Sequence, residues 1–321
     1  MTPIGIGLYG HNGHQLASDA MLTGAQVVAV CDVTNAPAGM TRHPSLPALL
    51  ADARVQLVVI CAPRRATQVD AIRLALRAGK HVIGEKPLVM RHDELDEVIS
   101  LAHQQGCQLF DMAGIADDAP YAAIPAVLAT GVLGEIGQIV VRKSYPYADW
   151  RPQDEDVDGG LIMQSGIHAI RLIAHCAGQR MTHVSALSCQ VGNPLARGGL
   201  QMAATIQAHL AGGGIASVVL NYYNQRGAQR WGDDELRIYG AGGLIMTDGD
   251  GGVQLVTANA ATAIVCATQP PYIQRVVDYI RGVAPRPRPV AQDFHATHVV
   301  IAARASAMQG GVWLAVPDFL V

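Results

Sequence analysis

The sequence predicts a protein of two domains: an α/β domain with a doubly wound parallel sheet in residues 1–118, then an α+β domain with a mostly antiparallel sheet in residues 119–321. Three observations support this fold class. A short apolar strand near the N-terminus runs into a glycine-spaced turn, strand and helix patterns alternate through the first third, and strand patterns joined by glycine-rich turns follow from about Ile136. A chain of 321 residues is long enough for two such cores.

The composition is that of a compact, water-soluble protein. Half of the residues are hydrophobic, 15% are charged and the formal net charge is −3, which disfavours disorder and a nucleic-acid-binding surface. No apolar stretch reaches membrane-spanning length, and the first strand begins too early to leave room for a signal peptide, so we expect no membrane association and a cytoplasmic location. The six cysteines form no C-x-x-C pair and the twelve histidines no H-E-x-x-H motif, so we predict reduced thiols and no metal site.

The turn after the first strand has the glycine spacing of a dinucleotide-binding loop. It departs from G-x-G-x-x-G in one place, because Leu8 stands where the first glycine usually falls and Gly7 comes one position early. Glycines let the backbone approach a pyrophosphate, and the N–H groups at the start of the following helix bind its charge. We expect Asn12 to cap that helix. The predicted cofactor contacts in this turn are Gly7, Leu8, Gly10, His11, Asn12 and Gly13.

An acidic residue stands at the end of the second strand, which we expect over residues 27–31. Asp32 follows Gly13 at close to the expected spacing of about 20 residues. Its carboxylate would accept hydrogen bonds from the adenosine ribose and repel a 2′-phosphate, so NAD is favoured over NADP. Strand, turn, helix and acid together indicate a Rossmann domain. The alternative is an ordinary strand-to-helix turn with a solvated aspartate.

A lysine follows a later strand of the same domain. Apolar runs predict strands over residues 56–61 and 81–83, joined by a helix that begins near Thr67. Lys86 then lies at the carboxyl edge of a parallel sheet, where ligands bind. A partly desolvated lysine with a lowered pKa can exchange a proton with a substrate hydroxyl. The alternative is a surface lysine in a turn.

The second half of the chain has a different pattern. Two helices are expected near residues 167–176 and 272–281, and a last helix, about 293–309, is expected to pack back on the first domain. The predicted strands cover residues 138–143, 201–209, 215–221, 236–239 and 253–257.

The chain resembles the Gfo/Idh/MocA family of NAD(P)-dependent sugar and polyol oxidoreductases. The segment Ala78–Leu88, which contains Gly-Glu-Lys-Pro, is similar to a family signature almost residue for residue, and the positions of Asp32 and Pro63 also match. The resemblance implies a Rossmann domain followed by an open-faced sheet that floors the substrate pocket and forms homodimers or homotetramers. It also implies further cofactor contacts at Ala62, Pro63, Glu85 and Lys86.

A second family signature is similar to residues 159–170. The resemblance implies that His168 and Lys86 share the acid/base work. From the residues alone, His168 lies one helical turn after Gln164, so the two could grip one ligand, but a histidine on an apolar helix is often a core residue. Gln164 departs from the family, which usually has an aspartate there, and cannot titrate.

Aromatic residues on the loop before this signature could line a sugar site or serve as packing residues. The candidates for substrate binding, besides Gln164, are Tyr145, Trp150 and Arg151. We therefore predict an NAD-dependent dehydrogenase that moves hydride between a secondary hydroxyl of a sugar, polyol or related compound and nicotinamide. Two alternatives stay open: an NAD-using glycosidase or lyase with transient oxidation and no net redox change, and a non-catalytic regulator that binds NAD and a sugar.

Overall fold

The chain divides into two compact units in the computed structural model. The first unit contains Met1–Ala113, Asp156–Gly159 and Pro270–Asp293, and the second contains Gly114–Glu155, Gly160–Gln269 and Phe294–Val321. The first continuous stretch thus ends at Ala113 rather than at 118, and two later segments join it. The structure describes residues 2–17, 21–34, 36, 39–112, 114–229, 231–247, 251–267 and 269–318.

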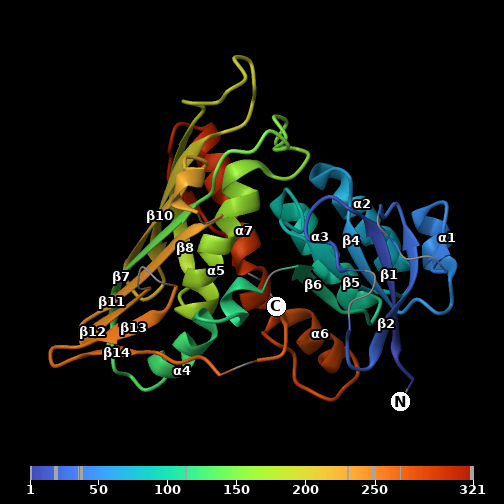
Figure 1. Ribbon diagram of the computed structural model, residues 1–321, viewed down its shortest axis with the longest axis horizontal. Helices are drawn as coiled ribbons and strands as arrows, with labels where there is room; N and C mark the ends of the chain where they lie inside the picture. The colour runs from blue at the N-terminus through green and yellow to red at the C-terminus, as the bar shows by residue number, and fades with distance from the viewer. Residues whose placement is uncertain are drawn as a thin grey trace. The chain divides into compact units, whose positions relative to one another are not determined.

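A parallel sheet forms the centre of the first unit (Figure 1, blue to teal). Its strands are β1 (Ile4–Gly10), β2 (Ala25–Cys31), β3 (Thr41–Arg42), β4 (Leu57–Cys61), β5 (His81–Glu85) and β6 (Leu109–Met112). They lie in the order β3-β2-β1-β4-β5-β6, and every neighbouring pair is parallel. This is the strand order of a doubly wound dinucleotide-binding fold, so the predicted Rossmann sheet is confirmed.

Helices cover this sheet because β1, β4 and β5 are apolar on both sides. Ile6 and Leu8 of β1 belong to a buried cluster with Val276 and Val277, which α6 contributes. Gly7, which lies between Ile6 and Leu8, presents the opposite face of β1, toward Leu49 of α1. The helices of this unit are α1 (Leu46–Ala51), α2 (Gln68–Arg77), α3 (His92–Gln104) and α6 (Tyr272–Ile280).

The helix expected directly after the glycine turn is not found in the described residues of that segment, 11–17 and 21–24. These residues form bends and a short turn instead, and Leu16 and Leu22 pack against the core cluster to which α6 contributes. One face of the sheet is therefore covered in part by a helix from residues 272–280, far along the chain.

The second unit is built on a large sheet that is antiparallel except where β7 and β10 pair. Within the described residues its order is β14-β13-β12-β11-β7-β10-β9-β8-β15, which confirms the predicted mostly antiparallel sheet. Its strands are β7 (Ile136–Ser144), β8 (Met181–Cys189), β9 (Ala203–Leu210), β10 (Ile215–Asn221), β11 (Asp233–Gly240), β12 (Gly243–Thr247), β13 (Val253–Val256), β14 (Ala261–Ala263) and β15 (Leu314–Ala315).

The helices of the second unit include α4 (Ile124–Leu128), α5 (Gly166–Arg171) and α7 (Val290–Met308), of which α7 belongs to this unit from Phe294 on. Wider helical turns of the π type flank α5 at Leu161–Ser165 and Leu172–Cys176. Gly166 lets α5 approach the sheet closely, because a Cβ there would lie 2.9 Å from Leu220 of β10. The predicted packing of the last helix on the first domain stays a prediction. No helix in the described ranges combines the length and apolar character needed to cross a bilayer.

Candidate functional site

A cavity of about 540 Å³ lies in the first unit at the carboxyl edge of the parallel sheet. Since β1 lies between β2 and β4, the residues that follow these strands meet there, at the point where the strand order reverses. Three of the predicted cofactor contacts, Asp32, Ala62 and Pro63, line this cavity. Tyr9 and Ser45 also line it and were not predicted. Ser45 caps α1, since its hydroxyl accepts a hydrogen bond from the Ala48 N–H.

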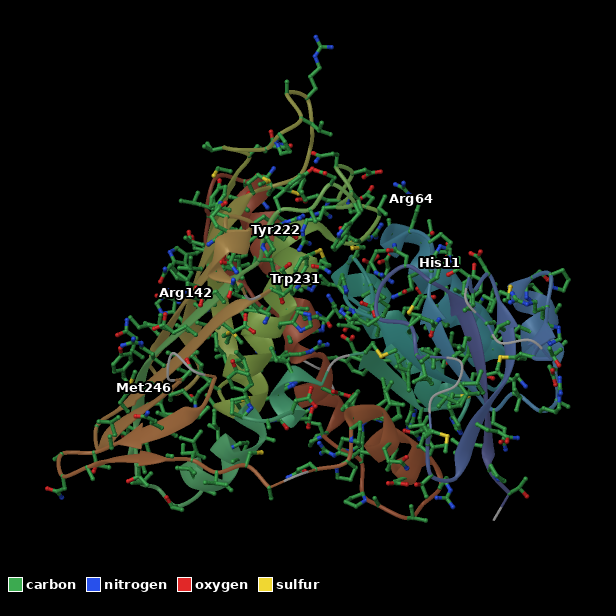
Figure 2. All side chains as sticks on the ribbon, viewed as in Figure 1. His11, Arg64, Arg142, Tyr222, Trp231 and Met246 are labelled. Carbon is green, nitrogen blue, oxygen red and sulfur yellow. The ribbon has the colours of Figure 1, made fainter. Side chains whose placement is uncertain are left out.

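Asp32 lies at the rim of the cavity with its side chain exposed. Its φ of +55° is in the left-handed region, which is uncommon for a residue with a Cβ and turns the chain sharply as β2 ends. His11, labelled in Figure 2, places Nδ1 3.0 Å from the Asp32 carbonyl oxygen. The pKa of Tyr9 is raised by burial and by the nearby Cys31 and Asp32, so its phenol stays protonated and can donate a hydrogen bond into the cavity.

The glycine turn lies tightly over the ends of β4 and β5. Gly10 has a φ of +74°, and a Cβ there would lie 2.0 Å from the carbonyl oxygen of Cys61. Gly13 has a φ of +121°, and a Cβ there would lie 2.6 Å from Cδ of Glu85. These two positions require glycine. Gly7 and Leu8 lie inside β1, so their contact with a cofactor stays a prediction.

Asn12 fixes the turn to other loops of the first unit. No helix follows it within residues 11–17, so the predicted helix cap is wrong. Its side-chain amide instead donates hydrogen bonds to the carbonyl oxygens of Pro63, at 3.0 Å, and Val157, at 2.7 Å. The amide therefore ties the segment Asp156–Gly159 to the carboxyl edge of the sheet.

Glu85 anchors the turn from the end of β5. Its carboxylate is buried and accepts a hydrogen bond from the backbone N–H of His14 at 3.1 Å, and its Oε1 lies 2.9 Å from His14 Nδ1. Burial alone would raise the pKa of Glu85, but the His14 hydrogen bond and the charges of Lys86 and Arg65 outweigh it and lower that pKa. The position of Glu85 against the turn agrees with a role in shaping the cofactor site.

Lys86 follows Glu85 and is only 1% exposed. The buried side chain of Gln68 holds the backbone on both sides of it, because Nε2 donates to the carbonyl oxygens of Glu85 at 2.7 Å and Leu88 at 3.0 Å. Arg65 in turn bonds to Gln68 Oε1 and, at 2.8 Å, to the carbonyl oxygen of Asn12. No pattern in the sequence pointed to Gln68 and Arg65, since polar residues near a helix start usually face solvent.

Gln164 and His168 are the exception in an otherwise buried helical segment of the second unit. Every other residue from 161 to 177 is buried, whereas these two are partly exposed. They share one side of the segment, as the spacing predicted. Gln164 Oε1 accepts a hydrogen bond from the Ser165 hydroxyl at 2.8 Å. Because Lys86 and His168 belong to different units, their convergence on one substrate stays a prediction.

The aromatic residues predicted to bind substrate gather at one edge of the second sheet. Ser144 at the end of β7 pairs with Asn221 at the end of β10 and with Asp233 at the start of β11, so the residues just beyond these positions lie together. They are Tyr145, Tyr222 and Trp231, the last two labelled in Figure 2.

One further ring and one guanidinium complete this cluster. Trp150 stacks on Trp231 with the ring centres 6.3 Å apart, and the guanidinium of Arg151 lies 3.9 Å from the centre of the Tyr222 ring. The Tyr222 hydroxyl lies 3.3 Å from the hydroxyl of Ser165, next to Gln164. The structure thus brings together Tyr145, Trp150 and Arg151 and connects them to Gln164. Tyr222 and Trp231 were missed, since no local pattern reveals which distant strands pair with β7.

Among the described residues, no group of three or more His, Cys, Asp or Glu side chains could hold a metal ion. The cavity and the glycine turn are the features that could accept a cofactor. Fold and site together define the class of protein: a doubly wound domain of the dinucleotide-binding type joined to a separate sheet domain.

Comparison with known proteins identifies the family. Residues 4–112 match a family model described as an oxidoreductase family with an NAD-binding Rossmann fold, and residues 121–246 match the model of the Gfo/Idh/MocA C-terminal domain. The chain belongs to the Gfo/Idh/MocA oxidoreductase family, as its signatures predicted.

Curated relatives match over part of their length. A dTDP-3,4-didehydro-2,6-dideoxy-alpha-D-glucose 3-reductase from Streptomyces violaceoruber is 29% identical over 109 residues, which is 33% of this chain and 32% of that protein. A D-xylose 1-dehydrogenase (NADP(+)) 2 from Haloferax volcanii is 30% identical over 160 residues, 49% of this chain and 48% of that protein. The chain therefore spans a third to a half of the length of these relatives.

Solved structures share the fold over the whole chain. An aldose-aldose oxidoreductase from Caulobacter crescentus, complexed with glycerol, is 17% identical with a TM-score of 0.81, covering 98% of this chain and 99% of that chain. The WlbA dehydrogenase from Bordetella pertussis, in complex with NADH and UDP-GlcNAcA, is 19% identical with a TM-score of 0.78, covering 99% of both chains.

Proposed function

We propose that this protein is an NAD-dependent dehydrogenase that transfers hydride between a secondary hydroxyl of a sugar, polyol or related hydroxy compound and nicotinamide. The observation that carries the proposal is the cavity at the carboxyl edge of the parallel sheet, with Asp32 at its rim and Lys86 at the end of a neighbouring strand. The sugar-related names of the curated relatives support the substrate class.

The residues present fit a dinucleotide. The cavity offers about 540 Å³ beside Asp32, Ala62 and Pro63, and a Cβ at Gly10 or Gly13 would clash in the adjoining turn. Asp32 would accept hydrogen bonds from the adenosine ribose, and the turn would lie against the pyrophosphate. The exposed carboxylate of Asp32 disfavours a 2′-phosphate, which supports NAD over NADP.

The proton transfer is assigned to this chain's own side chains. When bound, nicotinamide accepts or returns the hydride. Lys86, whose backbone Gln68 holds in place, takes the proton of the substrate hydroxyl, and His168 assists it. Gln164 orients the hydroxyl without titrating, since an amide neither gains nor loses a proton at neutral pH.

Replacing Lys86 with methionine tests this assignment. General acid/base groups contribute roughly 10²- to 10⁴-fold to a rate, so Lys86→Met should lower turnover by that factor while leaving NAD affinity nearly unchanged. The assay follows NADH formation from NAD with a panel of sugars, polyols and inositols. Lys80→Met is the matched control, because Lys80 lies at the opposite end of β5 and bonds the carbonyl oxygen of Val55 at 2.7 Å. Equal turnover in Lys86→Met and wild type would remove Lys86 from the mechanism.

The same preparation separates the two alternative functions. Cleavage of glycosides without accumulation of NADH would support a transient-oxidation glycosidase or lyase. Tight binding of NAD and a sugar with no conversion of any compound in either assay would support a regulator. Net NADH formation from one of the panel compounds supports the dehydrogenase.

A further inference from the structure

A buried arginine in the second unit has aromatic rings as neighbours and no acidic partner among the described residues. Arg151 is 5% exposed, and its guanidinium carbon lies 3.9 Å from the ring centre of Tyr222 and 4.9 Å from that of Trp150. Its Nε is buried and makes no hydrogen bond, and no carboxylate of the described residues forms an ion pair with it. Arg142 of the same unit differs, since it pairs with both Asp233 and Glu235.

A buried cation without a counter-ion is costly, because it has lost water and gained no charge of opposite sign. The rings offset part of that cost through cation–π attraction. A guanidinium stacked on a ring by its face keeps the N–H groups at its edge available for a planar acceptor. The cluster is therefore electrostatically incomplete until an anion joins it.

The charge balance around the cluster favours one negative charge. Among the described residues, Lys143 also lies near these rings, with Nζ 5.3 Å from the centre of the Tyr145 ring, but Asp234 already neutralises it at 2.5 Å. Within the part of the chain that the structure describes, Arg151 is left as one uncompensated positive charge. A single guanidinium fork matches one carboxylate with two parallel hydrogen bonds, whereas a phosphate dianion would bring more charge than this site balances.

The cluster is continuous with the proposed substrate site. Tyr222 contacts Arg151 with its ring, and its hydroxyl lies 3.3 Å from that of Ser165, which bonds to Gln164. Trp150, 66% exposed, presents a wide apolar surface on the solvent side of the same cluster. A molecule that Gln164 orients by a hydroxyl would extend toward this cationic, aromatic surface.

We propose that the substrate of this dehydrogenase is an acid: a polyhydroxylated compound whose carboxylate pairs with Arg151 and whose C–H face packs on Trp150. The proposal rests on the proposed function for the chemistry at the hydroxyl group. It adds the recognition of a negative charge by the second unit, which the oxidation itself does not require.

Matched pairs of acids and neutral compounds test the preference. Binding to the full-length protein is measured by calorimetry, alone and with saturating NADH, for D-glucuronate against D-glucose, D-galacturonate against D-galactose and D-gluconate against D-glucitol. We expect at least one acid to bind about tenfold or more tightly than its neutral partner, and the difference to shrink as salt is raised. If no acid binds more tightly than its neutral partner, the proposal is overturned.

Variants assign the preference to the guanidinium. Arg151→Gln should lower the affinity for the preferred acid at least about tenfold and leave the neutral partner within about twofold, while the control Arg142→Gln leaves both unchanged. If Arg151→Gln does not fold, Arg151→Lys, which keeps the charge but loses the fork, should show a reduced preference. An acid preference that survives unchanged in a folded Arg151 variant overturns the proposal.

Two further measurements distinguish this inference from phosphate recognition and from the proposed function. If D-glucose 6-phosphate binds more tightly than D-glucuronate, the anion is a phosphate and the carboxylate assignment is wrong. A protein that prefers acids through Arg151 but binds no NAD would keep this inference and refute the proposed function. NAD-dependent turnover with equal affinity for acids and neutral compounds would support the proposed function and overturn this inference.

Discussion

Replacing Asp32 with alanine should shift the cofactor preference from NADH toward NADPH. In the structure Asp32 stands at the rim of the cavity, exposed, at the turn that ends β2. Alanine would remove both the acceptor for the ribose hydroxyls and the negative charge that opposes a 2′-phosphate. The loss of the acceptor weakens NADH binding and the loss of the charge strengthens NADPH binding, so both lower the preference for NADH.

The size of the shift follows from the exposure of this carboxylate. In a water-like dielectric, two unit charges about 4 Å apart interact by about 1 kcal/mol, and a phosphate monoester carries about −1.5 to −2, so the repulsion amounts to about 2 kcal/mol. Loss of a hydrogen bond to a charged acceptor costs NADH a further ~1.5 kcal/mol. Together they predict a change in the NADH/NADPH affinity ratio of roughly 10²- to 10³-fold.

Calorimetric titration of each reduced cofactor into wild type and Asp32→Ala measures this ratio. Asp70→Ala is the matched control, because Asp70 lines the same cavity but accepts a hydrogen bond from Arg73 at 2.8 Å. We expect the control to change the ratio less than about threefold, consistent with an exposed charge that is already paired. An Asp32→Ala protein with the wild-type ratio would refute the placement of the ribose beside Asp32.

Two more predictions concern stability in the second unit. Asp234→Asn removes the negative charge beside the buried Lys143 ammonium and should lower the free energy of unfolding in urea by about 3 kcal/mol; a loss under about 1 kcal/mol would show that Lys143 does not depend on that ion pair. His295 accepts a hydrogen bond from the Met181 N–H at 3.0 Å, and burial, with smaller effects of nearby cations, lowers its pKa to about 4. The unfolded histidine, with a pKa near 6.5, binds the extra proton, so stability is complete above about pH 6.5 and declines toward pH 4. His295→Gln should flatten that slope in melting experiments, and an unchanged slope would exclude His295 as its source.

The sequence predicted the parallel sheet and its ligand-binding edge well, because those features are local. Buried strands such as β4 appear as continuous apolar runs, and the position of Asp32 depends only on its distance from the glycine turn. The helix expected after that turn is not found in the described residues 11–17 and 21–24, and α6, which comes from a distant part of the chain, covers part of that face. Local periodicity carries no information about such a replacement.

Only part of the aromatic cluster could be predicted, because some of its residues are close in sequence and others are brought in by distant strands. Tyr145, Trp150 and Arg151 lie on one loop, so their proximity could be read from the sequence. Tyr222 and Trp231 join them only because β10 pairs with β7 in parallel and β11 pairs with β7 on its other edge. Strand pairing across long crossovers is set by the global topology, and no spacing of residues reports it.

The discontinuous make-up of the first unit has a consequence for its biosynthesis. The N-terminal sheet lacks Val276 and Val277, which join the buried cluster of Ile6 and Leu8, until α6 has been translated, more than two hundred and sixty residues after β1. During that interval the nascent chain exposes an apolar sheet surface, while most of the other unit emerges from the ribosome. The order of assembly is therefore imposed by the chain's own path: the nucleotide-binding half begins first, yet it cannot be finished before the half that interrupts it has largely been made.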